Sequence, residues 1–438
     1  MFHSTLLKYS FINRLHSRMT REQIKKMQLK KFHALVQFVS GNSPYYQEVI
    51  KKNKIDIGNC KPEDFPILTK ETLIERFDDI VTDRRITKRI VTDFLSHSHD
   101  PLELFLNKYY VIHTSGSSGT VGYFIYTQEE LIRGIIHFSR IKTPSMGQKM
   151  AYIAATKGHY AGVTMASIAK LMPFLYKDVQ MFDINMPFSE IITRLQKFQP
   201  TALGGYAFAI RKLAEAQRAG NLAIKPQIIQ SGGEPLSNRD KEYIEEVFNI
   251  PVVNIYAASE YLIIGIGKDE YDGMYLMEDD LIFELYENYT CVTNLFNYTL
   301  PLIRYQMNDR LEKVSDPLHK LPFTKVADLV GRKEHVPVFV NDKGEEDFIS
   351  PILLAEFYVK NLASFQFHLL NKRSFIFKAT LEKGLDKHTI EKTKQAIAQE
   401  LKKILAEKNM TKVTFIIEIV DHLWVHPKTG KFQLIVKK

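Results

Sequence analysis

The sequence predicts an α/β fold, with a large N-terminal α/β domain built on open mixed sheets and a small C-terminal α+β domain joined to it by a hinge. Between residues 149 and 256, short apolar runs alternate with longer stretches whose apolar residues recur at helical spacing. From residue 271 strand-like runs follow one another, and the segment from residue 331 has a hairpin, helix and strand pattern of its own. Such alternation is typical of an open sheet that binds ligands at the carboxyl ends of its strands.

Length and composition support a globular protein of more than one domain. The chain has 438 residues, which exceeds one ordinary core, and it is 45% hydrophobic and 25% charged. No apolar run approaches the roughly 18 residues that a membrane-spanning helix needs. The two cysteines, Cys60 and Cys291, lie far apart without metal-type spacing. They exclude a zinc site built from cysteines and fit a reducing cytosol, so we expect a cytoplasmic protein.

The formal net charge of +9 is compatible with nucleic acid, with an anionic small substrate, or with solubility alone. The basic residues are dispersed and form no stripe with interleaved aromatic residues, which argues against nucleic acid. The first 21 residues contain no acid, as in a transit peptide. Apolar residues continue at helical spacing as far as Val39, which favours an amphipathic helical start to the domain instead.

The first hundred residues predict helices. Residues 20–52 have a helical pattern interrupted by a Gly-Asn-Ser-Pro turn, and Thr69 is placed to cap a second helical stretch. Residues 80–108 show little periodicity and are expected to be loop. They contain His97 and His99, which could bind a metal ion, but no third ligand is evident nearby, and this favours a surface loop.

The remaining elements follow from apolar periodicity and from turn residues. Expected strands are 109–112, 124–127, 151–155, 201–203, 227–230, 252–256, 274–278, 281–285, 291–295 and 413–420, with a hairpin formed by 365–370 and 375–379. Expected helices are 128–141, 188–198, 206–219, 237–248 and 387–408. We place the domain boundary at 330/331, so that 1–330 is the N-terminal domain, with a helical start over 1–100, and 331–438 is a mobile C-terminal domain.

The stretch from His113 to Thr120, HTSGSSGT, follows one of these strands. Its two glycines, Gly116 and Gly119, permit positive φ, so that successive N–H groups can face one concavity. Hydroxyl groups surround that concavity, from Thr114, Ser115, Ser117, Ser118 and Thr120. The loop suits a polyphosphate, although a plain turn has the same composition. It is not the common P-loop, because no Gly-Lys-Ser/Thr follows.

Seven motifs occur in one order along the chain: HTSGSSGT at 113–120, GHYAG at 158–162, SGGEP at 231–235, IYAASE at 255–260, PLIRYQMND at 301–309, GRKE at 331–334 and HPKTGK at 426–431. Together they resemble the adenylate-forming superfamily of acyl-CoA synthetases and adenylation domains. The upstream segments Ser43–Tyr46 and Phe65–Lys70 are similar to elements of its phenylacetate–CoA ligase-like branch. Each motif alone is weak, but the ordered set is specific and covers nearly the whole chain.

The sequence departs from the family pattern in two places. Val121 and Gly122 follow the Ser/Gly loop where the family has Thr-Gly and then Pro or Lys. The motif expected as Tyr-Arg-Thr-Gly-Asp has Gln306 in place of the Arg and Asn308 in place of the Gly, while its Asp is retained. These departures bear on loop shape and nucleotide affinity more than on the chemistry.

The resemblance implies that ATP activates a carboxylic acid, expected to be aromatic, as an acyl-adenylate with release of pyrophosphate. The acyl group then passes to a thiol, with coenzyme A as the first expectation and a carrier protein or an amine as alternatives. A non-catalytic nucleotide-binding protein is an alternative of another class, but it would need neither Glu260 nor Lys431. Neither nucleic acid nor a membrane is expected as a partner, and the oligomeric state stays open, a homodimer included.

The resemblance also implies a residue for each part of the nucleotide. The Ser/Gly loop would hold the β- and γ-phosphates, Glu260 would bind Mg²⁺ and Ser259 would contact the α-phosphate. Asp309, with two acceptor oxygens, would bind the ribose hydroxyls with help from Arg332. Tyr256 would offer its ring to adenine, beside a loop formed by Gly232, Gly233, Glu234 and Pro235.

The remaining implied roles concern the reacting acid and the second domain. Lys431 would neutralise charge in the adenylating transition state, with Lys428 at a less specific position nearby. The domain would swing about Lys333 or Glu334 between the two half-reactions. His159, Tyr160 and Tyr206 would border the acyl pocket. The structural alternatives are a basic tail, a static linker and a buried core histidine.

Overall fold

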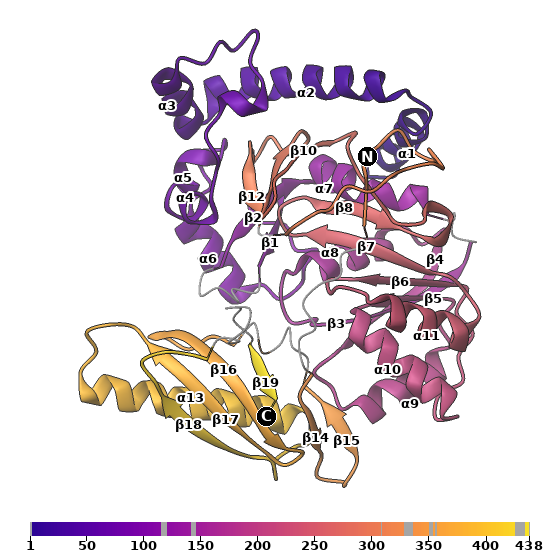
Figure 1. Cartoon of the computed structure of the whole chain (residues 1–438), viewed down its shortest axis with the longest axis vertical. Coiled ribbons are helices and arrows are strands. Elements are labelled where there is room, and N and C mark those ends of the chain that lie inside the picture. Colours follow the sequence, from indigo (N-terminus) through magenta and orange to yellow (C-terminus); the bar gives the residue numbers. More distant parts are fainter. Residues whose placement is uncertain are drawn as a thin grey trace.

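The computed structural model describes residues 2–114, 121–141, 146–307, 309–327, 336–349, 354, 357–424 and 434–437. A large body formed by the N-terminal residues lies above a smaller sheet-and-helix body formed by the C-terminal residues (Figure 1). This arrangement of two unequal α/β parts confirms the predicted fold class. The proposed boundary at 330/331 falls among residues outside the described part and stays a prediction.

The chain begins with helices, as predicted. They are α1 (Phe2–His16), α2 (Arg21–Asn42), α3 (Pro44–Asn53), α4 (Lys70–Glu75), α5 (Phe77–Ile80) and α6 (Lys88–His97), with a 3₁₀ turn η1 (Pro62–Asp64). Thr20 and Gln23 form a capping box at the start of α2, and Thr69 accepts a hydrogen bond from Thr72 N at the start of α4. Helix α6 corrects the expected loop over 80–108. Its apolar residues Ile90, Val91, Phe94 and Leu95 recur at helical spacing and pack against the core, but this short stripe was overlooked in the sequence.

A β-hairpin carries the Ser/Gly loop. Strands β1 (Tyr109–His113) and β2 (Tyr123–Thr127) pair antiparallel, with His113 opposite Tyr123. Helix α7 (Gln128–Ile135) and the 3₁₀ helix η2 (Ile136–Arg140) follow, so the helix expected over 128–141 tightens in its second half. Strand β2 ends where the capping box of Thr127 and Glu130 starts α7.

An eight-stranded mixed sheet with the order β13-β9-β8-β7-β6-β5-β3-β4 forms the centre of the N-terminal body. Its strands are β3 (Gln148–Ala154), β4 (Tyr176–Asp183), β5 (Ala202–Gly205), β6 (Ile228–Gly232), β7 (Val252–Ala258), β8 (Leu262–Gly267), β9 (Met274–Leu276) and β13 (Lys325–Val326). Neighbours from β4 to β7 run parallel, and the others run antiparallel. The sequence did not predict β4, an edge strand with polar residues, or β8, which is apolar throughout.

Helices cover both faces of this sheet. Those with bounds close to the predicted ones, α9 (Phe188–Phe198), α10 (Ala207–Arg218) and α11 (Asn238–Phe248), share a core on one face. On the other side lie α7, α8 (Ala161–Ser167), the 3₁₀ helix η3 (Ile168–Leu171) and a three-stranded sheet of β10 (Leu281–Leu285), β11 (Thr290–Asn294) and β12 (Tyr305–Met307). A short 3₁₀ helix, η4 (Asp269–Tyr271), precedes β9.

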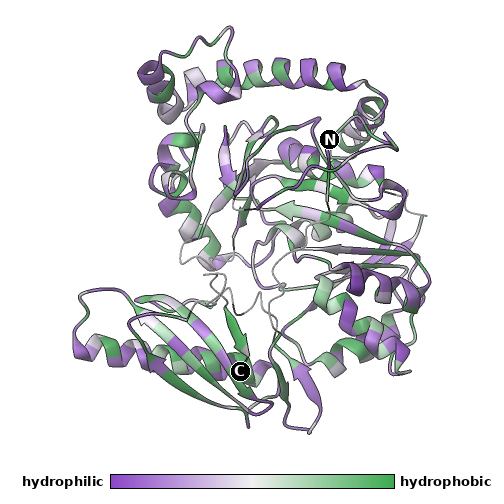
Figure 2. Cartoon of the chain, viewed as in Figure 1, coloured by the Kyte–Doolittle hydropathy of each residue, from purple (hydrophilic) through white to green (hydrophobic). Residues whose placement is uncertain are grey.

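The C-terminal body is a four-stranded sheet of order β18-β17-β16-β19 covered by one long helix, α13 (Lys387–Glu407). Its strands are β16 (Leu362–Asn371), β17 (Ser374–Leu381), β18 (Thr414–Ile419) and β19 (Ile435–Lys437), which agree with the expected hairpin, helix and strand. Apolar and polar positions alternate along the strands and divide the helix into two faces (Figure 2). The apolar face of α13 packs Ile397 and Leu401 against the sheet phenylalanines.

A small hairpin of β14 (Val338–Val340) and β15 (Glu346–Phe348) joins the two bodies. The Phe348 ring lies 4.6 Å, between centroids, from Phe208 on α10, whereas Phe339 lies 5.5 Å from Phe375 in the C-terminal sheet. The hairpin therefore belongs to both cores. Among the described helices, none combines the length and the apolar composition that crossing a bilayer would require.

Candidate active site

Parallel strands bring the predicted motifs to one edge of the central sheet. Strands β3, β5, β6 and β7 run in the same direction, so their carboxyl ends coincide. The segment 158–162 follows β3, Tyr206 follows β5, Gly233 follows β6, and Ser259–Glu260 follows β7. A ligand site at this edge is what an open parallel sheet predicts.

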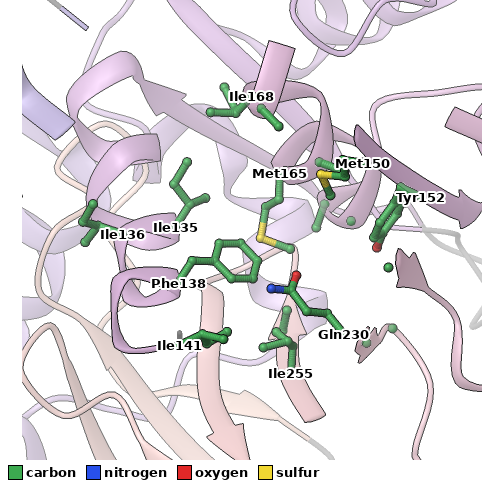
Figure 3. A pocket seen from close by; sticks show the side chains of 18 of the residues that line it. Ile135, Ile136, Phe138, Ile141, Met150, Tyr152, Met165, Ile168, Gln230 and Ile255 are labelled. Carbon is green, nitrogen blue, oxygen red and sulfur yellow. The ribbon is translucent and has the colours of Figure 1, made fainter. Parts of the chain in front are cut away.

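A cavity of about 810 Å³ opens at this edge. Residues with a predicted role on its wall are Thr114, Tyr160, Tyr206, Gly232, Gly233, Ser259, Glu260 and Asp309. Apolar side chains from η2, α8 and the sheet line its interior (Figure 3). One cavity thus joins a polar mouth to an apolar body, which suits a ligand with the same division.

The described end of the Ser/Gly loop lies at the polar mouth. Thr114 N donates to Gly122 O over 3.0 Å, and Thr114 Oγ1 accepts a hydrogen bond from Gly122 N at 2.9 Å, which closes the base of the loop. Ser259 Oγ donates to His113 O at 3.4 Å, so the loop and the β7 motif are neighbours. The predicted phosphate ligands Ser115, Gly116, Ser117, Ser118, Gly119 and Thr120 lie outside the described residues.

Glu260 is a carboxyl group in an environment that disfavours its charge. Burial raises its pKa from 4.5 to about 7, against smaller opposing effects that include Lys70 and Tyr305. The turn that carries it is fixed from two sides, because Tyr126 Oη donates to Ser259 O at 2.7 Å and Asn294 Nδ2 donates to Glu260 O at 3.3 Å. A divalent cation at the mouth would favour the ionised carboxylate, so the chemistry of this group fits the predicted Mg²⁺ ligand.

Tyr256 and Asp309 are neighbours although 53 residues separate them. The Tyr256 hydroxyl donates to Asp309 Oδ2 over 2.7 Å, and Thr290 Oγ1 donates to the Asp309 carbonyl over 2.9 Å. Burial, and then the Asp309 charge, raise the pKa of Tyr256 well above its usual value, so this hydroxyl stays protonated. The residues predicted for adenine and for ribose therefore form one hydrogen-bonded unit. Arg332, the predicted helper, lies outside the described residues.

The β6 motif contributes backbone to the cavity, and its carboxylate has another task. A Cβ at Gly232 would lie 3.2 Å from Ile255 O, and Gly233, with φ of +77°, faces the Tyr206 ring. Glu234 Oε2 accepts a hydrogen bond from Phe208 N, at 3.0 Å, in the first turn of α10. Glu234 and Pro235, predicted to flank adenine, do not line the cavity.

His159 requires a correction. It is fully buried, its Nε2 lies 3.0 Å from Ser98 Oγ, and its Nδ1 lies 3.2 Å from Val111 O. Burial lowers its pKa, which favours the neutral ring. His159 is not part of the cavity lining, so it supports the wall from behind, whereas its neighbour Tyr160 lines the cavity.

Sequence reasoning missed most of the cavity interior. Its apolar walls include Ile135, Ile136, Phe138, Ile141, Met150, Met165, Ile168 and Ile255, and two polar side chains, Tyr152 and Gln230, stand among them (Figure 3). These residues lie within strands and helices, where an apolar or mixed pattern has the appearance of ordinary core. Lys70, at the start of α4, also lines the mouth; it ends the segment Phe65–Lys70 noted for its resemblance, but the sequence assigned it no role in the site.

A second group of ionisable side chains lies outside the cavity. His137, Asp279 and Asp280 are close enough together to suggest a metal site. However, Arg140 Nη2 lies 2.7 Å from Asp279 Oδ2, and Arg133 Nη2 lies 2.6 Å from Asp280 Oδ1. These cations hold the pKa values of both carboxyls below their usual range, and burial lowers the pKa of His137 to about 4. The group is a buried ion-pair network without need of a metal ion.

His97 and His99, for which the sequence favoured a surface position over a metal site, are both exposed. His97 Nδ1 lies 3.0 Å from Asp93 O within α6, and the described residues offer the pair no third ligand. The other predicted site residues, Lys333, Glu334, Lys428 and Lys431, lie outside the described residues.

Comparison of the sequence with known proteins finds one curated relative. No protein-family model matches the chain. A curated relative, Protein CapK of Staphylococcus aureus, is 25% identical over 318 residues, which are 66% of this chain and 62% of that protein. The match therefore spans less than two thirds of the curated relative's length.

Solved structures match along nearly the whole chain. 2-Hydroxyisobutyryl-CoA ligase in complex with 2-HIB-AMP and CoA, in the thioesterification state, has a TM-score of 0.60 at 15% identity and covers 97% of this chain and 91% of that one. The chain has the adenylate-forming ligase fold. The same ligase in the postadenylation state, with R3-HIB-AMP, gives a TM-score of 0.58 at 15% identity, over 97% of this chain and 92% of that one. The likeness to these structures is one of fold, and it agrees with the architecture that the motifs implied.

Proposed function

We propose that the chain is an ATP-dependent acid–thiol ligase. It activates a carboxylic acid as an acyl-adenylate, releases pyrophosphate and transfers the acyl group to a thiol, with coenzyme A as the first candidate. One observation carries the proposal: Thr114, Ser259, Glu260 and Asp309, which come from three separate segments, meet at the mouth of one cavity whose interior is apolar. A nucleotide fits the mouth and the body of an organic acid fits the interior.

The first half-reaction joins the two ligands at that mouth. A carboxylate oxygen of the acid attacks the α-phosphorus of ATP, the bond to the β-phosphate oxygen breaks, and pyrophosphate leaves. The chain's task is to hold the reacting groups in line and to place opposite charge. Asp309 orients the ribose, Tyr256 offers its ring to adenine, Thr114 and the Ser/Gly loop hold the outer phosphates, and Ser259 faces the α-phosphate. Glu260 would hold Mg²⁺, which supplies countercharge to the phosphates when bound.

Lys431 is the proposed cation from the C-terminal domain. The described residues on both sides of its segment attach to neighbouring positions of β16, because Trp424 N donates to Gln366 Oε1 at 2.9 Å and Phe367 N donates to Leu434 O at 2.8 Å. These attachments support a catalytic segment carried by this domain. Lys333 or Glu334 would then be the hinge about which the domain moves between the half-reactions.

The proposal also specifies the acyl acceptor and the kind of acid. A solved structure of the same fold is named as a CoA complex, which favours CoA over a carrier protein or an amine. The aromatic rings of Phe138 and Tyr152 in the cavity favour an aromatic acid, as the phenylacetate–CoA ligase-like motifs do. A non-catalytic nucleotide-binding protein is the alternative of another class.

A panel of aromatic and aliphatic acids tests the proposal through pyrophosphate release, measured with and without CoA. The proposal expects at least one acid to stimulate release and CoA to be consumed as a thioester. Release without thioester would point to a carrier protein or an amine as acceptor. Tight ATP binding without acid-stimulated release across the panel would support the non-catalytic alternative and overturn the proposal.

A further inference from the structure

Two polar side chains project into the apolar part of the cavity from adjacent strands of the central sheet. The sheet register aligns Tyr152 on β3 with Gly204 on β5, and Gly204 with Gln230 on β6. All three residues line the cavity. Residues that are paired across neighbouring strands have their side-chain positions on the same face of the sheet. Tyr152, Gly204 and Gln230 therefore form a row across the floor of the cavity.

Glycines make the space that this row needs. A Cβ at Gly204 would lie 2.9 Å from Tyr152 Cδ2, so the tyrosine ring lies over β5 on the way toward Gln230. A Cβ at Gly162 on α8 would lie 2.5 Å from the Tyr152 hydroxyl, which fixes the other end of the side chain. The absence of two side chains therefore places the aromatic ring and its hydroxyl.

The Gln230 amide points among Phe138, Met165 and Ile255 in Figure 3. Within the described residues, neither this amide nor the Tyr152 hydroxyl has a hydrogen-bond partner, and both side chains are only partly buried because the cavity is open beside them. A polar group held against apolar walls gains most from a ligand that supplies the missing hydrogen bond. The charged residues that line the cavity, Lys70, Glu260 and Asp309, belong to the nucleotide mouth, and Arg14 of α1 is the remaining one.

The position of Gln230 along β6 sets its distance from the SGGEP motif. Gln230 precedes Gly232, the first glycine of the SGGEP motif, by two residues, which is roughly 6–7 Å along a strand. An acid whose carboxylate lies at the level of Gly232 therefore brings atoms near the middle of its body to Gln230. This separation is about that between the carboxyl carbon and a para substituent of phenylacetic acid.

We propose that the acid has an apolar body bearing one neutral hydrogen-bonding group, a hydroxyl or a carbonyl, roughly 6–7 Å from its carboxylate, and that Gln230 with Tyr152 recognises that group. The proposal rests on the acid ligase function above and names the substrate class of its cavity. Gln230 is then a specificity-determining residue. A site built to form such a bond rejects the analogue that lacks the group, since its own polar atoms would stay buried and unpaired.

Matched acids test this inference: phenylacetic against 4-hydroxyphenylacetic acid, and octanoic against 6-hydroxyoctanoic acid. The wild type should favour the hydroxylated member by tenfold or more in kcat/KM. Gln230→Leu should reduce that preference to within threefold, mainly by losing activity toward the hydroxylated acid. Gln230→Asn, which keeps the amide but shortens its reach, should retain part of the preference. Met150→Leu, a shape change on the same wall, should leave the preference within a factor of two.

Calorimetric binding of the same acids to the full chain separates this inference from the proposed function. A hydroxyl preference in binding without pyrophosphate release would refute the ligase and keep the recognition by Gln230. Activity confined to the plain acids, or a preference unchanged in a folded Gln230→Leu variant, would overturn the recognition and leave the ligase standing. Melting curves establish that each variant is folded. If Gln230→Leu fails to fold, Gln230→Asn is compared with the wild type instead. An unchanged preference for the hydroxylated acid in Gln230→Asn would then overturn the recognition.

Discussion

The amino group of Lys408 lies 3.3 Å from Asp347 Oδ1, and both side chains are buried where the C-terminal body meets the N-terminal one. Lys408 Nζ also donates to the carbonyl oxygens of Ile184, at 3.2 Å, and Met186, at 2.7 Å. Asp347 Oδ2 accepts a hydrogen bond from Phe188 N, at 2.9 Å, at the start of α9. Three segments far apart in sequence thus share one buried ion pair, which fixes how the two bodies dock.

Replacing Lys408 should loosen this docking. Lys408→Met leaves the Asp347 carboxylate buried without its cation, which costs about 3–5 kcal/mol. We expect a lower melting temperature and a larger radius of gyration by small-angle X-ray scattering. The control is Lys403→Met, because the Lys403 side chain is 63% exposed and pairs with Glu400 on the surface. Equal behaviour of the two variants would contradict the docking role of the pair.

The raised pKa of Glu260 predicts a pH effect on activity. Its pKa is about 7 in the folded chain, so the carboxyl gains a proton as the pH falls through 7. Pyrophosphate release at subsaturating Mg²⁺ should therefore decline below pH 7 and recover when Mg²⁺ is raised. Glu260→Gln should lose about 10²–10³ in rate at all pH values. A rate independent of Mg²⁺ at pH 6 would count against Glu260 as the metal ligand.

The raised pKa of Glu260 also predicts that its contribution to stability is lost as the pH rises, opposite to its effect on activity. A carboxyl whose folded pKa exceeds its usual 4.5 stabilises the fold fully below pH 4.5, and this contribution disappears as the pH rises through 7. Glu260→Gln should therefore unfold at a higher temperature than the wild type at pH 8, by roughly 1–3 °C. The gap should vanish near pH 4, which thermal scans at both pH values will show.

The hydrogen bond from Tyr256 to Asp309 predicts graded losses of nucleotide affinity. Tyr256→Phe removes one neutral donor and should raise the KM for ATP about threefold to tenfold. Asp309→Asn removes the charged acceptor for the ribose and should raise it about tenfold to a hundredfold. The KM for the acid should change little in either variant. Tyr286→Phe is the control, because its hydroxyl donates to Glu284, at 2.9 Å, outside the cavity lining.

The buried ion-pair network around Asp279 should stabilise the fold strongly without a bound metal ion. Arg140→Met leaves the Asp279 carboxylate uncompensated and should lower the free energy of unfolding by about 3–5 kcal/mol. Arg85→Met, which removes an exposed pair with Asp83, should cost less than about 1 kcal/mol. Treatment with a chelator should leave the melting temperature unchanged. A drop on chelation, reversed by a divalent cation, would show that this group binds a metal after all.

Much of the fold could be predicted because its elements have strong local signals. Thr69 caps α4 as expected, and α10, α11 and α13 lie close to the ranges that the sequence predicts. Helix α6 was missed although Ile90, Val91, Phe94 and Leu95 recur at helical spacing, because the stripe is short. Strand β4 has mostly polar, partly exposed residues, so its pairing with β3 and not its own pattern decides its structure.

The residues of the site likewise fall into those that the sequence could identify and those that it could not. Ser259 and Glu260 could be identified because they follow a predicted strand and belong to one of the seven ordered motifs. Gln230 and Tyr152 stand inside strands, where a lone polar residue in an apolar run gives no hint of its face or its neighbours. His159, although part of a motif, lies behind the cavity wall, with its ring nitrogens beside Ser98 and Val111.

Acid-dependent exchange of labelled pyrophosphate into ATP tests the central claim most directly, because it requires a reversible acyl-adenylate and no acceptor. We expect exchange with at least one carboxylic acid, a loss of about 10²–10³ in Lys431→Ala, and near-normal exchange in the matched Lys428→Ala. Exchange absent with every acid tested, or unaffected by Lys431→Ala, would contradict the account.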